Sequence, residues 1–156
     1  MMSVDAFAQS SRAHGWPVQC FYGSRSKSAA SDERKLFGMI DSLRRIVLSP
    51  PAMSERFHAL FLDQGRALVG QTSLGFGSMC GVHLRFRELF AYALGVGADS
   101  MIIAHNHPSG DCRPSRSDVE ATKRLASVAN ALEIELIAHL IFTQAAVFSK
   151  RGGSEL

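Results

Sequence analysis

The feature that most constrains this chain is a histidine pair, His105 and His107, that follows the apolar run Met101–Ala104. A short apolar run of this kind predicts a buried β-strand. Because residues two apart in a strand point to the same face, both imidazoles can reach one metal ion. Asp118 follows them and can supply a third ligand. Three protein ligands with an open fourth position are typical of catalytic zinc, whereas structural zinc is usually held by four.

The sequence after the histidines predicts how Asp118 returns to them. Pro108-Ser109-Gly110 indicates a turn, and the alanine, leucine and basic residues of Ser115–Ala131 favour a helix. The first turn of this helix carries Asp118. Ser115 and Asp118 also have the spacing of a capping box, with aspartate in place of the usual glutamate or glutamine. The two interpretations are compatible, because a cap also fixes the Asp118 carboxylate for a metal.

Composition favours one small globular domain. The chain has 156 residues, 46% of them hydrophobic, which is enough for a single core. It has no apolar run of the roughly 18 residues that a membrane helix needs, so no membrane association is expected. The net charge of +3 comes from 17 basic and 14 acidic side chains. A solvated surface explains this small excess as well as nucleic-acid binding does.

Cysteine usage indicates a reducing compartment. Cys20, Cys80 and Cys112 are an odd number without CxxC spacing, which favours neither a disulfide framework nor a thiolate zinc site. No secretory signal is visible either, so we expect a cytoplasmic protein. Cys112 is an alternative metal ligand near the histidines, but Asp118 has the better placement.

Two segments are predicted along the chain: a flexible N-terminal segment, residues 1–30, and a domain, residues 31–156. The sequence around residues 24–31 is small and polar, with no periodic apolar positions to bury. Ser31 is predicted as the N-cap of a helix that Pro50-Pro51 ends.

The rest of the chain alternates strands and helices after an initial hairpin. Strands follow from apolar and β-branched runs, and helices from apolar positions three and four apart. The predicted strands are 57–62, 67–74, 101–104, 134–142 and 145–148, and the predicted helices are 84–94 and 115–131. This order predicts an α/β (α+β) fold with a mixed sheet covered by helices.

The residues around the histidines resemble a known family motif. The runs His105–Asp111 and Pro114–Asp118 contain the HxHP, serine and aspartate positions of the JAB/MPN metalloenzyme motif, also called JAMM. Within that superfamily, HNHPSGD followed by PS and D resembles the RadC-like branch. The resemblance extends from about Asp32 to Phe148. It implies the deaminase-like sandwich of MPN domains.

The resemblance also implies an activity. Carried over by position, His105, His107 and Asp118 are metal ligands for Zn²⁺, and Ser115 is catalytic, stabilising the oxyanion formed when water attacks a carbonyl. The implied reaction is metallopeptidase-type hydrolysis of an amide or isopeptide bond in a peptide or protein substrate. Zinc suits this role, because it lowers the pKa of water and polarises carbonyls.

The general base of the family is where this chain departs from the pattern. The RadC-like form has a glutamate five residues before a glycine; here that glycine is Gly77, which puts Thr72 at the glutamate position. Threonine does not take a proton from water at neutral pH, so hydrolysis is expected to be slower by ~10²–10⁴-fold. Three other carboxylates, Glu55, Asp63 and Glu88, are not expected to replace it.

Three function hypotheses follow. The first is the zinc-dependent hydrolase. The second is a non-catalytic MPN module for partner binding, which Thr72 favours. The third is a protein associated with nucleic acid or DNA repair, for which only the basic charge and the family association speak. His139 lies inside an apolar strand and is predicted to be a hydrogen-bonded core histidine, not a fourth ligand.

Overall fold

The computed structural model describes residues 29–50, 53–76 and 86–150. It divides into two compact units, residues 1–42 and residues 43–156. Helix α2, Ala29–Val47, crosses the boundary between them, and every described strand belongs to the second unit. The predicted flexible segment, residues 1–30, lies almost wholly outside the described residues. The division at residue 30 therefore stays a prediction.

The described part of the second unit is built on a mixed five-stranded sheet, as the sequence predicted, with strand order β2-β1-β3-β4-β5. The strands are β1 Arg56–Leu62, β2 Leu68–Phe76, β3 Ser100–Asn106, β4 Glu135–Phe142 and β5 Val147–Lys150. Strands β3 and β4 are parallel, and the other neighbours are antiparallel. A parallel pair needs a crossover connection, and helix α4, Arg116–Ala131, supplies it.

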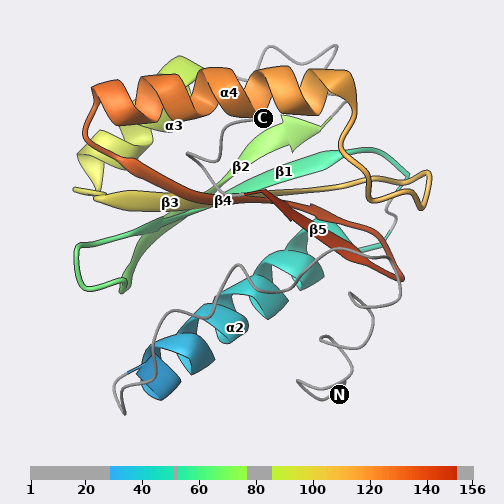
Figure 1. Ribbon diagram of the computed structural model, residues 1–156, viewed down its shortest axis with the longest axis horizontal. Coiled ribbons are helices and arrows are strands. Elements are labelled where there is room, and N and C mark those ends of the chain that lie inside the picture. Colours follow the sequence, from blue (N-terminus) through green and yellow to red (C-terminus); the bar gives the residue numbers. More distant parts are fainter. Residues whose placement is uncertain (1–28, 51–52, 77–85, 151–156) are drawn as a thin grey trace. The chain divides into compact units, whose positions relative to one another are not determined.

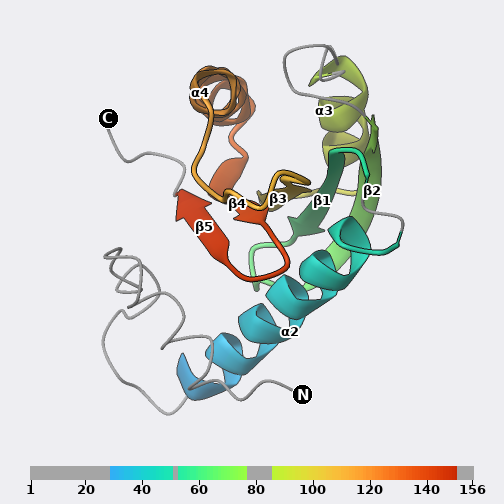
Figure 2. The same ribbon diagram turned by 90° about the vertical axis from the view of Figure 1, so that its right-hand side faces the viewer.

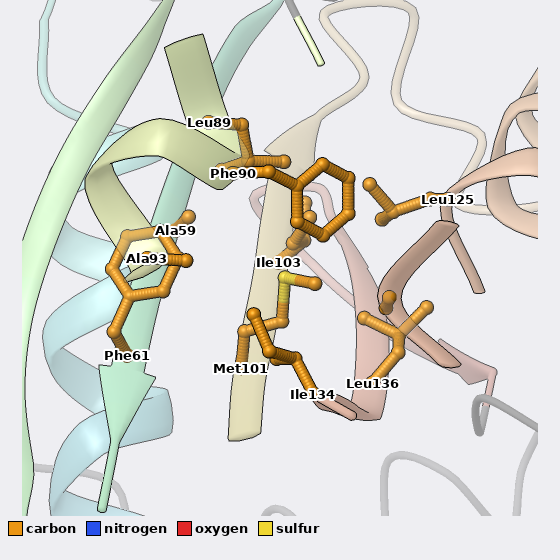
Figure 3. Close-up of a cluster of buried hydrophobic side chains, with 11 residues drawn as sticks. Ala59, Phe61, Leu89, Phe90, Ala93, Met101, Ile103, Leu125, Ile134 and Leu136 are labelled. Carbon is orange, nitrogen blue, oxygen red and sulfur yellow. The ribbon is translucent and has the colours of Figure 1, made fainter. Parts of the chain in front are cut away.

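Helix α3, Phe86–Gly95, and helix α4 lie over the same face of the sheet (Figures 1 and 2). Each helix turns an apolar stripe toward the sheet. The resulting core cluster contains Ala59, Phe61, Leu89, Phe90, Ala93, Met101, Ile103, Leu125, Ala129, Ile134 and Leu136 (Figure 3). Gly70 lets α3 approach β2, since a Cβ there would lie 2.9 Å from Tyr92 Cε1. Neither these helices nor α2 is long and apolar enough to span a membrane.

Strand β3 runs through the centre of the sheet and is buried along its whole length. Met101 and Ile103 enter the core cluster under the two helices. Because side chains alternate between the faces of a strand, His105 is the next residue on this helix-covered face. The fold therefore places the histidine pair at the carboxyl end of a buried strand, next to the apolar core.

Several predicted boundaries differ from the structure: β2 and β3 each extend two residues beyond their predicted ends, to Phe76 and Asn106. Helix α2 begins at Ala29, so Ser31 is a helical residue and not the N-cap; the two alanines before it are strong helix formers and extend the helix. Strand β5 was predicted two residues too early, because Thr143 and Ala146 close the turn before it: the Thr143 amide donates to the Ala146 carbonyl at 2.9 Å. The start predicted for α3, residues 84–85, lies outside the described residues.

Candidate metal centre

His105 and His107 converge at the carboxyl end of β3. His105 belongs to the strand and is fully buried. His107 follows directly, and its amide donates a hydrogen bond of 2.9 Å to the Phe142 carbonyl in β4, which holds it beside the sheet. The two Nε2 atoms lie 3.0 Å apart. The structure thus brings together the two rings that the strand pattern placed on one face.

Asp118 reaches the histidines because it lies in the first turn of α4. Ser115 is the N-cap, and the reciprocal capping box expected from the sequence is confirmed. The Asp118 amide donates to Ser115 Oγ at 3.1 Å, and the Ser115 amide donates to Asp118 Oδ2 at 2.7 Å. Asp118 Oδ1 lies 3.4 Å from His105 Nε2, and Oδ2 lies 3.3 Å from His107 Nε2. The cap therefore orients the carboxylate toward both imidazoles.

His105, His107 and Asp118 form a group that could hold a metal ion, with candidate ligand atoms within 4.8 Å of one another. Two imidazole nitrogens and a carboxylate oxygen are donors that zinc accepts, and three protein ligands leave a position open for water or substrate. Within the described ranges no second group of this kind occurs. Cys112, the alternative ligand, is not a member of it.

Burial and hydrogen bonding give the three groups different protonation. Burial lowers the pKa of His105 well below its ordinary value, and His139 behind it lowers the pKa further. The hydrogen bond with Asp118 raises the pKa of His107. Burial opposes ionisation of Asp118, but hydrogen bonds from His107 and Ser115 outweigh it and hold its pKa below the usual range. An ionised carboxylate beside a neutral imidazole suits a bound cation.

Glu55 lies immediately before β1 and faces the same site. Strand β1 is antiparallel to β3, with Phe57 opposite His105. Glu55, two residues before Phe57, is therefore opposite His107, two residues after His105. Glu55, His107 and Ser115 line a cavity of about 550 Å³. The charge of Glu55 also contributes to the raised pKa of His107.

Thr72, the position at which the sequence predicted the family glutamate to be replaced, lies elsewhere in the structure. Thr72 pairs with Ala59 in β1 and does not line the cavity, and Gly77, from which its position was counted, lies outside the described residues. Asp63 lies in the β1–β2 turn, where its Oδ1 accepts a hydrogen bond of 2.8 Å from the Ala67 amide. The sequence signal that could have identified Glu55 is its place directly before the strand β1. That signal is weak, because the sequence does not show that β1 pairs with β3.

His139 in β4 is a buried histidine with partners on both ring nitrogens, as the sequence predicted. Its Nε2 lies 2.8 Å from His105 Nδ1, and its Nδ1 lies 2.7 Å from Thr122 Oγ1 in α4. The contact between His139 and His105 was not predicted from the sequence. His58 belongs elsewhere: its ring contacts Ser73 at 3.0 Å in β2.

Comparison with known proteins gives a consistent result. The family model described as RadC-like JAB domain matches residues 38–154. A UPF0758 protein of Syntrophomonas wolfei is 34% identical over 131 residues, covering 74% of this chain and 55% of that protein. Another from Flavobacterium johnsoniae is 29% identical and covers 79% of this chain and 56% of that protein. The chain thus spans about half the length of the curated relatives it matches.

Proposed function

The chain belongs to the RadC-like JAB domain family, and from that premise we propose that it is a zinc-dependent hydrolase of amide or isopeptide bonds in peptides or proteins. In this proposal His105, His107 and Asp118 hold one zinc ion. The observation that carries the proposal is their convergence, within 4.8 Å, beside a cavity that a carboxylate also lines. Zinc held there would supply Lewis-acid chemistry, lowering the pKa of a water molecule and polarising a substrate carbonyl.

Glu55 is the general base in this proposal. Its position opposite His107, at the wall of the cavity, lets it take the proton of the attacking water and later deliver it to the leaving amine. A carboxylate is suited to this exchange, whereas Thr72, away from the cavity, is not. With Glu55 as base, the general base predicted to be missing at Thr72 in β2 is supplied from the residue immediately before β1.

Ser115 has two tasks in the proposal. Its hydroxyl donates to Asp118 Oδ2 at 2.6 Å and so holds the carboxylate in place. The side chain also lines the cavity, so rotation about its Cα–Cβ bond would turn the same hydroxyl toward the oxyanion of the substrate.

The test separates metal binding from hydrolysis. We expect about one zinc per chain in the purified protein by elemental analysis, and none in His105→Ala. Cleavage of fluorogenic linear and isopeptide-linked peptides should fall by roughly 10²–10⁴-fold in Glu55→Gln, with the zinc content unchanged. Glu88→Gln, which changes an exposed glutamate on α3, is the matched control and should keep both properties.

Other outcomes would redirect the proposal. Full activity of Glu55→Gln would show that Glu55 is not the base. We expect no gain of activity in Thr72→Glu. A gain would indicate that the general base acts from β2 and not from Glu55. A folded, zinc-loaded protein that cleaves neither peptide would favour the non-catalytic module that binds a partner.

A further inference from the structure

We propose that Thr122 and His139 form a relay of hydrogen bonds that fixes His105 in the tautomer with Nδ1 protonated and Nε2 directed at the metal site. The two are positioning residues: neither lines the cavity that Glu55 and His107 share. The inference rests on the metal-binding part of the proposed function and is independent of its hydrolytic part.

The relay crosses three elements of the fold. Thr122 Oγ1 in α4 donates to the Asp118 carbonyl oxygen at 2.6 Å and lies 2.7 Å from His139 Nδ1 in β4. His139 Nε2 in turn lies 2.8 Å from His105 Nδ1 in β3. All three side chains are buried, with exposed fractions of 4% or less. No bulk water competes for these hydrogen bonds, so each nitrogen depends on its protein partner.

The direction of every hydrogen bond follows from counting protons. A carbonyl oxygen only accepts, so the single hydroxyl proton of Thr122 goes to the Asp118 carbonyl. Toward His139, Thr122 Oγ1 is then the acceptor, and His139 Nδ1 must carry a proton. A neutral imidazole has one N–H, which leaves His139 Nε2 as an acceptor.

The last hydrogen bond of the relay joins His139 to the proposed metal ligand His105. Because His139 Nε2 accepts, His105 Nδ1 must donate to it, and the lone pair of neutral His105 is then on Nε2. That atom lies 3.0 Å from His107 Nε2 and 3.4 Å from Asp118 Oδ1. Phe57 stacks on the His105 ring with centroids 4.6 Å apart and restricts its rotation. The fold thus sets both the tautomer and the orientation of the ligand.

This arrangement differs from the usual support of a metal-binding histidine. Such a ring most often donates its second N–H to a carboxylate, a backbone carbonyl or water. Here the acceptor is a second imidazole, that of His139, which is 2% exposed, and burial disfavours the charged form of an imidazole. Thr122 also joins the support of His105 to the backbone of a second ligand, Asp118. One hydroxyl therefore holds two ligands in register.

The decisive measurement is the tautomer of His105 in the metal-free protein, read from ¹⁵N and ¹H shifts of the imidazole at a pH where the ring is neutral. We expect the proton on Nδ1. A proton on Nε2 would overturn the proposal, and this reading needs no variant. A chain that shows the Nδ1 proton but binds no zinc would contradict the proposed function and leave the relay standing.

Variants then test the dependence on Thr122. Thr122→Val removes the hydroxyl at nearly constant volume and should give mixed tautomers at His105, with zinc affinity lower by roughly 10–100-fold against a chromophoric chelator. Thr122→Ser keeps the hydroxyl and should restore both. Thr143→Val is the matched control, because Thr143 is equally buried and hydrogen-bonded to Ala146, outside the relay. Equal zinc affinity in Thr122→Val and the natural chain would contradict the relay.

Discussion

The two ends of β3 are equally buried but depend on different kinds of contact. At the amino end, Met101 and Ile103 are at most 1% exposed and lie among apolar side chains. At the carboxyl end, His105 is 0% exposed and each ring nitrogen has a polar partner. An apolar core depends on volume and tolerates swaps that conserve it. A buried polar group depends on each individual partner. The first end therefore gives stability, and the second gives a defined chemical site.

The largest effect expected from this difference is on stability at the apolar end. Ile103→Ala should lower the free energy of unfolding by roughly 2–5 kcal/mol, because it leaves a cavity in the core. Urea denaturation of the metal-free protein measures this, with Ile103→Val as a graded control. The folded fraction should keep its zinc, whereas His105→Ala, two residues along the same face, should lose it. Loss of zinc from Ile103→Ala would mean that the two ends are not separable.

Acid should act on the polar end alone. Burial lowers the pKa of His139 from 6.5 to about 4, so between these values the unfolded chain binds a proton that the folded chain does not. The metal-free protein should therefore be fully stable above about pH 6.5 and lose up to about 3 kcal/mol as the pH falls toward 4. The lowered pKa of His105 acts in the same direction, whereas the raised pKa of His107 acts in the opposite direction.

Urea denaturation at several pH values checks the sign of the pH dependence and whether His139 causes it. Ile103→Ala should keep the pH slope of the natural chain, because it removes no titrating group. His139→Gln should flatten the slope. Stability that rises on acidification would contradict the assignment of a neutral buried His139.

The same contrast separates the features that could be predicted from the sequence from those that could not. Local patterns predicted β3, the cap at Ser115 and the convergence of Asp118 on the histidines, because a strand period and a helix turn are short-range. Glu55 was set aside, since its place opposite His107 depends on pairing between β1 and β3, which no local pattern reveals. The contact of His139 with His105 depends in the same way on the register of the parallel pair.

A smaller effect is expected at the N-terminus of α4, on the polar side of the comparison. Ser115→Ala removes the side-chain half of the capping box and should cost about 1 kcal/mol of unfolding free energy. Ser127→Ala, the same change at an exposed position of the same helix, should be nearly neutral. Thermal denaturation of the two variants gives the difference. Equal melting temperatures would mean that the cap adds no stability and serves only to orient Asp118.

The smallest effect is expected on the surface at the other end of the sheet. Arg66 and Glu135 form an ion pair of 2.6 Å, with side chains 48% and 59% exposed. Because solvent screens such a pair, Glu135→Gln should change stability by less than about 1 kcal/mol, and less again in high salt. Urea denaturation at low and high salt checks this. A larger loss that salt does not reduce would show that the pair has a structural role beyond its charges.

The crossover from β3 through α4 to β4 has a consequence for how such a protein can change over time. The proposed ligands and relay residues all come from this one unbroken stretch of sequence, residues 105–139, whereas Glu55 lies immediately before β1. In the proposed mechanism, the residues that hold the ion and the residue that removes the proton therefore come from separate parts of the sequence. Under the proposed function, a single substitution at Glu55 would turn the hydrolase into a metal-dependent binding module, because every residue proposed to hold the ion would stay as it was.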